Sequence, residues 1–154
     1  MRGQVSVPIL NYLEITEQLG TGGQPDHKAF AGLAAAGYRV VINLAMPHSE
    51  EALSEEDWLV TEQGMIYVHL PVPWEKPTLT HLAQFFALMD AFGDERVFVH
   101  CIVNMRVSVF VYLYRVCHMG IAPEVAQAPM LRIWQPHAQW QSLIEAALGD
   151  ANLR

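Results

Sequence analysis

The clearest structural signal in the chain comes from residues 97–106, which read Val97-Phe98-Val99-His100-Cys101-Ile102-Val103-Asn104-Met105-Arg106. The run starts with a short apolar stretch, Val97 to Val99, of the kind found in buried parallel strands. After Ser108, residues 109–117 are rich in β-branched and aromatic residues, and the segment closes at His118-Met119-Gly120. We predict a central buried helix there, although its residues favour strands, because burial routinely overrides propensity. Cys101 would then stand in a short loop between a strand and a helix.

The segments on both sides of this run alternate between strand and helix patterns. The predicted strands cover residues 12–16, 38–44, 66–70 and 97–99, and the predicted helices begin near Asp26, Glu50, Thr78, Ser108, Pro123 and Ala138. Residues 20–25 are interpreted as a turn, and Pro129 is expected to break or kink its helix. This alternation predicts an α/β fold with a central, mostly parallel sheet of about four to five strands flanked by helices.

Length and composition narrow the class of protein. The 154 residues fit a single domain covering 1–154, and no apolar stretch approaches the ~20 residues of a membrane span. The net charge of −7 argues against nucleic acid or an anionic membrane as a partner. Residues 1–8 lack the features of a secretory signal, and two cysteines are too few for a disulfide framework, so we expect a cytoplasmic location. The sequence leaves the oligomeric state open.

The loop after the predicted strand has the chemistry of an anion site. Open α/β sheets bind ligands at the carboxyl ends of their strands, and the backbone N–H groups of a loop and a first helical turn can converge on an anion. The helix dipole and Arg106 would favour the thiolate form of Cys101, and the planar Arg106 side chain can hold two oxygens of an oxyanion. The candidate phosphate-binding loop consists of Ile102, Val103, Asn104, Met105, Arg106 and Val107.

These residues resemble the signature of the cysteine-dependent phosphatases, both tyrosine-specific and dual-specificity, and the bacterial phosphatase-like branch is the most similar. The signature is His-Cys, then a short loop, then Arg and Ser or Thr. The turn at 22–25 and the strands at 41–44 and 67–71 add to the likeness. The resemblance implies a protein tyrosine phosphatase-like fold and hydrolysis of a phosphorylated small molecule or phosphoprotein through a phosphocysteine. It also implies that His100 orients the loop and that Ser108 assists breakdown of the intermediate.

The loop departs from that signature by one residue. Four residues separate Cys101 from Arg106, where the phosphatases have five. Asn104 stands where the family has glycine, and asparagine tolerates a left-handed conformation. Val107 falls on the position of the signature arginine. Unless the loop is rebuilt, Arg106 would therefore point about 100° around the helix axis from the direction of that arginine. The shorter loop also resembles that of the rhodanese sulfurtransferases. A sulfurtransferase using a Cys101 persulfide and a non-catalytic phosphate-binding module therefore remain alternatives.

The remaining candidate residues can also be interpreted as purely structural, without a role in binding or catalysis. Glu75 is the carboxylate nearest to the place where the phosphatases carry their acid, and it is equally interpretable as a solvated side chain. Cys101 could be an inert buried thiol, and Cys117 is assigned to packing. The acidic run at 50–57 is interpreted as a solvated helix face. No histidine or cysteine has metal-ligand spacing, so we expect neither a metal nor a cofactor.

Overall fold

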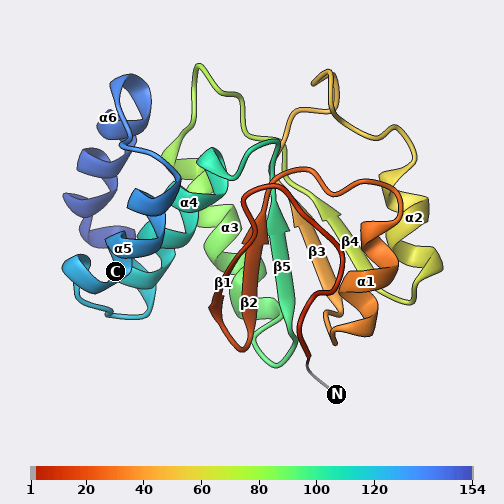
Figure 1. Cartoon of the computed structure of the whole chain (residues 1–154). Helices are drawn as coiled ribbons and strands as arrows, with labels where there is room; N and C mark the ends of the chain where they lie inside the picture. The colour runs from red at the N-terminus through yellow and green to blue at the C-terminus, as the bar shows by residue number, and fades with distance from the viewer. Residues whose placement is uncertain (1–2, 154) are drawn as a thin grey trace.

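A computed structural model describes residues 3–153, and its centre is a five-stranded sheet in the order β1-β2-β5-β3-β4 (Figure 1). The strands are β1 (Leu13–Thr16), β2 (Leu19–Gly22), β3 (Val40–Asn43), β4 (Ile66–His69) and β5 (Val97–His100). β1 runs antiparallel to β2, and the other neighbouring strands run parallel. The predicted α/β class with a mostly parallel sheet is confirmed.

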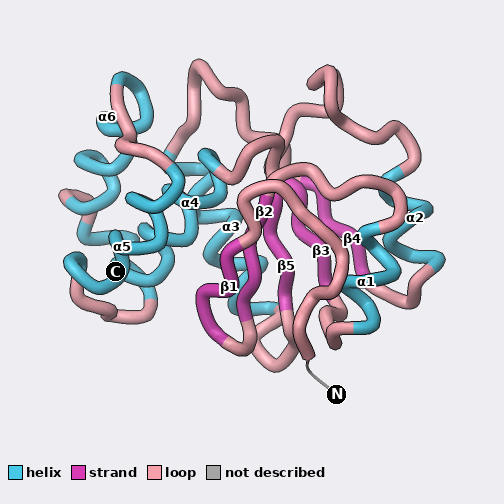
Figure 2. Tube along the Cα trace, in the orientation of Figure 1, coloured by secondary structure: helices cyan, strands magenta, loops and turns pink. Residues whose placement is uncertain are grey.

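Helices form two groups on opposite sides of the sheet, as Figures 1 and 2 show. The smaller group contains α1 (Ala29–Ala35) and α2 (Glu56–Glu62). The larger group contains α3 (Leu79–Ala91), α4 (Met105–Leu113), the π-helical turn η1 (Tyr114–His118), α5 (Pro123–Ile133), α6 (Ala138–Leu148) and the short 3-10 helix η2 (Ala151–Leu153). A sheet covered on both faces needs strands that are apolar on both faces.

The central strands meet this need through alternating side chains. In β3, Val40 and Ile42 pack in the larger core with α3, α4 and α6, whereas Val41 packs in the smaller core with Phe30 of α1. All four residues of β5 are buried, and Phe98 points into the smaller core. Burial on both faces explains why these strands read as continuous apolar runs rather than as an alternating pattern.

The prediction of a helix after the cysteine loop is confirmed. α4 is buried at every position from 107 to 113 despite its strand-like composition. It continues through η1, and Gly120 follows with a φ of +70°. A left-handed residue after the last turn is a common way to end a helix, and glycine adopts it without strain.

Two local predictions were wrong. Gly20 and Gly22 belong to strand β2 rather than to a turn. Glycine is required there by close packing, because a Cβ on Gly20 would clash with the Tyr38 ring and one on Gly22 would lie 3.0 Å from Phe98. The helix that contains Pro129 is continuous from Pro123 to Ile133, so the predicted break there is wrong, while a kink at Pro129 stays a prediction.

Candidate active site

Cys101 lies immediately beyond the centre of the sheet. It follows β5, whose last residue is in register with Gly22 of β2 and Asn43 of β3, so the carboxyl ends of three parallel strands meet at this point. The Cys101 N–H donates to the Gly22 carbonyl at 3.3 Å, and the Leu44 N–H donates to the His100 carbonyl at 2.9 Å. Cys101 is a free thiol that is only 1% exposed. It therefore sits at the base of the loop that follows β5, whose place at the centre of the sheet Figure 1 shows.

Groups outside the loop hold two of its carbonyls. The Gln24 N–H donates to the Ile102 carbonyl at 2.9 Å, and the Asn11 side-chain amide donates to the Val103 carbonyl at 2.9 Å. Gly23 allows the first contact, because a Cβ at Gly23 would lie 2.5 Å from the Ile102 carbonyl oxygen. The segment that follows β2, residues 23–25, therefore supports the loop from one side.

A buried polar chain holds the carbonyl of Cys101 itself. His100 is fully buried, and its Nδ1 lies 2.9 Å from the Cys101 carbonyl oxygen. Its Nε2 lies 2.6 Å from Oε2 of Glu56, a residue that is 2% exposed. The Gln24 side-chain amide donates to the other Glu56 oxygen at 2.7 Å. The interpretation of the acidic run as a solvated face is thus wrong for Glu56, which belongs to the support of the loop.

The loop presents a row of unused donors. A trans peptide places each N–H opposite the preceding carbonyl, so carbonyls held outward turn the next N–H groups inward. No residue between 3 and 153 accepts a hydrogen bond from the six consecutive backbone N–H groups of residues 102–107. Unpaired N–H groups at a loop and a helix N-terminus form an anion-binding site.

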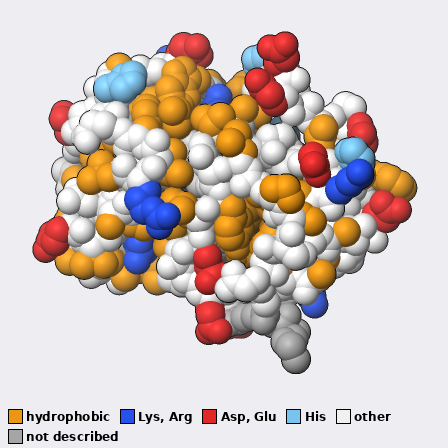
Figure 3. All heavy atoms as spheres, viewed as in Figure 1, with side chains coloured by type: hydrophobic (Ala, Val, Ile, Leu, Met, Phe, Trp, Pro, Cys, Tyr) orange, Lys and Arg blue, Asp and Glu red, His pale blue; other side chains and the backbone are white. Residues whose placement is uncertain are grey.

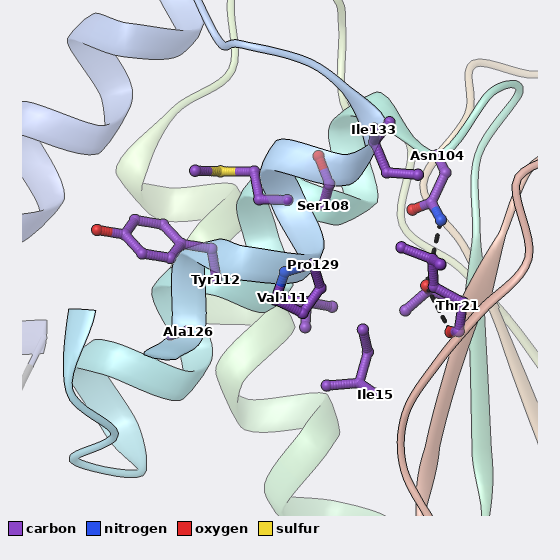
Figure 4. Close-up of a pocket in the computed structure, with 11 residues that line it drawn as sticks. Ile15, Thr21, Asn104, Ser108, Val111, Tyr112, Ala126, Pro129 and Ile133 are labelled. Atoms are coloured by element: carbon purple, nitrogen blue, oxygen red, sulfur yellow. Dashed lines mark hydrogen bonds between the residues drawn. The ribbon is translucent and has the colours of Figure 1, made fainter. Parts of the chain in front are cut away.

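Asn104 shapes the turn between the loop and α4. Its φ of +71° confirms the predicted left-handed conformation. Its Nδ2 donates to the Asn11 carbonyl at 2.8 Å and to Oγ1 of Thr21 at 3.1 Å. Figure 4 shows Asn104 at one end of a cavity of about 10 Å³ between β2 and helices α4 and α5. A cavity of this size holds one water at most, so it is a packing gap and not a substrate site.

Arg106 points toward the loop that joins β4 to α3. Its Nε donates to the Val72 carbonyl at 2.8 Å, and its Cζ lies 5.5 Å from the centre of the Trp74 ring. Among residues 3–153, no acceptor binds the two terminal nitrogens of its guanidinium group. One edge of the side chain is therefore anchored while its outer nitrogens remain available to an oxyanion.

The same loop carries Glu75 and is fixed by aromatic packing. The Trp74 ring packs against Trp134 and Trp140, with ring centres 5.5 and 5.2 Å away. The Trp74 carbonyl accepts hydrogen bonds from Nε1 of Trp140 and Nε2 of Gln139 in α6. Glu75 follows directly and is exposed. Within the described part of the chain it makes no hydrogen bond or ion pair, so its carboxyl group is free to meet a ligand.

Ser108 faces the helices rather than the loop. Its hydroxyl donates to the Met105 carbonyl at 2.7 Å and accepts a hydrogen bond from Nε1 of Trp134 at 2.9 Å. Its hydroxyl hydrogen is therefore engaged one turn back along α4. A direct role of Ser108 at the Cys101 sulfur remains a prediction that requires this hydroxyl to rotate.

One surface hollow borders the loop. It has a volume of about 290 Å³ and is lined by Ile102 and Val103 together with Gln24 and Leu53. A second hollow, of about 380 Å³, lies between α2 and the ends of β3 and β4 and includes Glu56 on its wall. Figure 3 shows acidic side chains along the upper edge of the molecule, where the loops after β3 and β4 lie. A ligand at this edge therefore meets acidic surroundings outside the row of N–H donors.

Sequence reasoning missed the supporting residues, because they come from distant parts of the chain. Asn11, Gln24 and Glu56 were not among the predicted site residues. A signal existed for Glu56, which stands four residues before the buried Val60 and so shares its helix face. No comparable pattern marks Asn11, whose contact with the loop spans 92 residues.

Every helix within residues 3–153 is too short or too polar to cross a membrane. No three His, Cys, Asp or Glu side chains in the range are grouped so that they could hold a metal ion.

No protein-family profile and no curated protein matches this sequence, but solved structures do. A DUF442 phosphatase-like protein from Shewanella putrefaciens CN-32 has 37% identity and a TM-score of 0.83, over 90% of this chain and 91% of its own. The catalytic domain of the S. cerevisiae PP-IP phosphatase SIW14, in complex with citrate, has 15% identity and a TM-score of 0.75, over 90% and 86%. P. aeruginosa TpbA, in complex with pTyr, has 14% identity and a TM-score of 0.66, over 92% of each chain. The last two likenesses concern the fold alone, and they confirm the predicted phosphatase-like architecture.

Proposed function

This chain belongs to the DUF442 family of phosphatase-like proteins, and from this premise we propose that it hydrolyses phosphomonoesters through a phosphocysteine at Cys101. The observation that carries the proposal is the row of six N–H groups from 102 to 107, which have no partner among residues 3–153 and directly follow a free thiol. Such donors compensate the charge of a phosphoryl group both when it binds and when charge develops in the transition state.

Cys101 is the proposed nucleophile and Arg106 the proposed clamp. The Cys101 thiolate attacks phosphorus, so that a sulfur–phosphorus bond forms as the ester bond to the leaving oxygen breaks. The outer nitrogens of Arg106 and the loop N–H groups hold the remaining phosphoryl oxygens. The Val72 carbonyl anchors Nε of Arg106 at 2.8 Å, which supports a fixed direction of approach despite the shortened loop. Preorganised donors of this kind need little rearrangement during the reaction.

Glu75 is the proposed acid and later the proposed base. It gives its proton to the leaving oxygen in the first step. A water molecule then attacks phosphorus, its proton passes to Glu75, and the sulfur–phosphorus bond breaks to return the thiolate and release phosphate. The support for this role is the exposure of Glu75 on the same loop whose Trp74 packs against Arg106. Substrates of the class bound by TpbA, which was solved with pTyr, are the first to examine.

The experiment is hydrolysis of an aryl phosphate and of a phosphotyrosine peptide with a chelator present, by the wild type, Cys101→Ser and Cys117→Ser. Cys117 is buried away from the loop and serves as the matched loss of a thiol. We expect turnover by the wild type and Cys117→Ser, and a loss of at least about a thousandfold in Cys101→Ser. Equal rates in wild type and Cys101→Ser would contradict the mechanism. Phosphate binding without turnover would indicate a non-catalytic module, and sulfur transfer from thiosulfate would indicate the rhodanese-like alternative.

A further inference from the structure

The buried pair behind the loop has an unusual hydrogen-bonding pattern, because both ring nitrogens of His100 face oxygen atoms. Nδ1 lies 2.9 Å from the Cys101 carbonyl oxygen, and Nε2 lies 2.6 Å from Oε2 of Glu56. A carbonyl oxygen accepts hydrogen bonds and cannot donate, so Nδ1 must carry a hydrogen. A second hydrogen must then lie between Nε2 and Oε2. The pair as a whole retains one proton more than a neutral histidine beside a carboxylate.

Gln24 completes the surroundings of the carboxyl group. Its Nε2 lies 2.7 Å from Oε1 of Glu56 and 3.1 Å from the Pro25 carbonyl oxygen. Because the Pro25 carbonyl only accepts, the atom facing both oxygens is the amide nitrogen, which donates to each. Both oxygens of Glu56 therefore face hydrogen-bond partners, the fully buried His100 and the half-buried Gln24, as a carboxylate requires in order to remain charged in a protein interior.

We propose that Glu56 is a positioning residue that holds His100 as an imidazolium, with the positive end of the ion pair toward the cysteine loop. Oε1 of Glu56 accepts from the Gln24 amide and Oε2 faces Nε2 of His100, so both oxygens are placed as acceptors and the shared proton is assigned to the ring. The positive ring contacts the loop at Cys101, while the negative carboxylate lies on the far side of the ring. The proposal rests on the proposed function only for its effect on turnover.

The ion pair would act on the loop in two ways. It holds the Cys101 carbonyl outward, which turns the Ile102 N–H toward the anion site. It also places a positive charge closer to Cys101 than the matching negative charge, which favours the thiolate and a bound phosphate. A neutral hydrogen-bonded pair would supply the first effect without the second.

Glu56→Gln separates these two effects. The introduced amide has an oxygen that can accept from Gln24 and a nitrogen that can donate to Nε2 of His100, so every hydrogen bond is preserved while the extra proton is lost. The matched control is Glu62→Gln, an exposed position on the same helix with the same change of charge. We would measure the rate of Cys101 alkylation by iodoacetamide as a function of pH, with Cys117→Ser as the background.

The expected result is a Glu56→Gln protein that is folded by circular dichroism and alkylated about five- to tenfold more slowly near neutral pH, with Glu62→Gln at the wild-type rate. A folded Glu56→Gln protein with the wild-type alkylation profile would overturn the positioning role. Alkylation does not need turnover. A wild type without phosphatase activity would therefore refute the proposed function and still leave this inference open to its own test.

Nitrogen NMR of histidine-labelled wild type provides the second measurement. At about pH 8, where a histidine in water is neutral, the proposed ion pair should give a signal from a histidine with protons on both nitrogens, and Glu56→Gln should abolish that signal. A wild-type spectrum without such a histidine would overturn the ion pair whatever the alkylation result. Should Glu56→Gln fail to fold, the wild-type spectrum decides alone.

Discussion

The cysteine loop has two flanks that are built in different ways. The polar flank consists of Gln24, Glu56 and His100, which hold the loop through buried and partly buried hydrogen bonds to its carbonyls and to one another. The aromatic flank consists of Trp74, Trp134 and Trp140, whose rings pack together beside Arg106. Hydrogen bonds are directional and depend on single atoms, whereas ring packing depends mainly on buried area.

The difference assigns a separate task to each flank. The polar flank determines which way individual peptide groups of the loop point, so it sets the row of N–H donors. The aromatic flank determines where the loop after β4 lies, and it leaves Glu75 exposed and the outer nitrogens of Arg106 unpaired among residues 3–153. Damage to the aromatic flank should therefore cost mainly stability, and damage to the polar flank should cost mainly activity.

The largest expected effect is on the aromatic flank. Trp140 is fully buried, and its Nε1 donates to the Trp74 carbonyl at 3.1 Å. Trp140→Ala should lower the free energy of unfolding by about 3–5 kcal/mol, because a large cavity forms and a hydrogen bond is lost. Urea denaturation measures this change.

The matched control is Trp58→Ala, since Trp58 is 59% exposed on α2. Its effect should stay within about 0.5 kcal/mol. If Trp140→Ala retained wild-type stability, the rings would not be what fixes this flank. A loss of activity in excess of the unfolded fraction would show instead that both flanks control the chemistry.

A smaller effect on stability, and a larger one on activity, is expected from Gly23→Ala. The new Cβ would lie 2.5 Å from the Ile102 carbonyl oxygen and 3.1 Å from the Leu10 carbonyl oxygen. Both are backbone atoms, so the clash can be relieved only by moving the main chain. We expect a loss of about 1–3 kcal/mol, together with a fall in kcat at temperatures where the protein remains folded. Gly3→Ala is the control, because nothing lies within 4 Å of its Cβ. Unchanged kcat in a folded Gly23→Ala protein would mean that the turn does not set the loop.

The parts of this molecule that local patterns could predict are those decided by neighbours in sequence. The run at 97–99 and the capping residue Thr78 were correctly placed, since strand composition and the Thr78 contact to the His81 N–H are local features. The left-handed Asn104 also followed from a short motif. The position of Cys101 at the carboxyl edge followed from the fold class.

The polar flank could not be predicted, because its contacts join distant segments. Glu56 meets His100 across 44 positions, and its neighbours in the chain are exposed acidic residues that make the whole run look solvated. Gly20 was mistaken for a turn residue. The ring of Tyr38 excludes any side chain at that position, and Tyr38 lies in the segment that joins α1 to β3. In both cases the residue type is determined by contact with a residue that is distant in the sequence.

The smallest expected effect concerns the influence of the Glu56 charge on the pKa of a residue beyond the polar flank, Tyr67. Burial raises the pKa of Tyr67 from 10.0 to about 12, and the Glu56 charge adds to the rise. The neutral hydroxyl therefore contributes stability that is complete below pH 10 and is lost as the pH rises through 12. Tyr67→Phe should make the free energy of unfolding fall less steeply between about pH 10 and pH 12, as measured by urea denaturation.

The same substitution in a Glu56→Gln background tests the coupling. Because part of the shift comes from the Glu56 charge, Tyr67→Phe should flatten the pH dependence less there than in the wild type. Tyr112→Phe is the control, since burial also raises the pKa of Tyr112 but Glu56 is not among the causes. Its effect should be equal in both backgrounds. If Tyr67→Phe flattened the pH dependence equally in the wild type and in Glu56→Gln, the Glu56 charge would not act on Tyr67. Its influence would then be confined to its hydrogen-bond partners, His100 and Gln24.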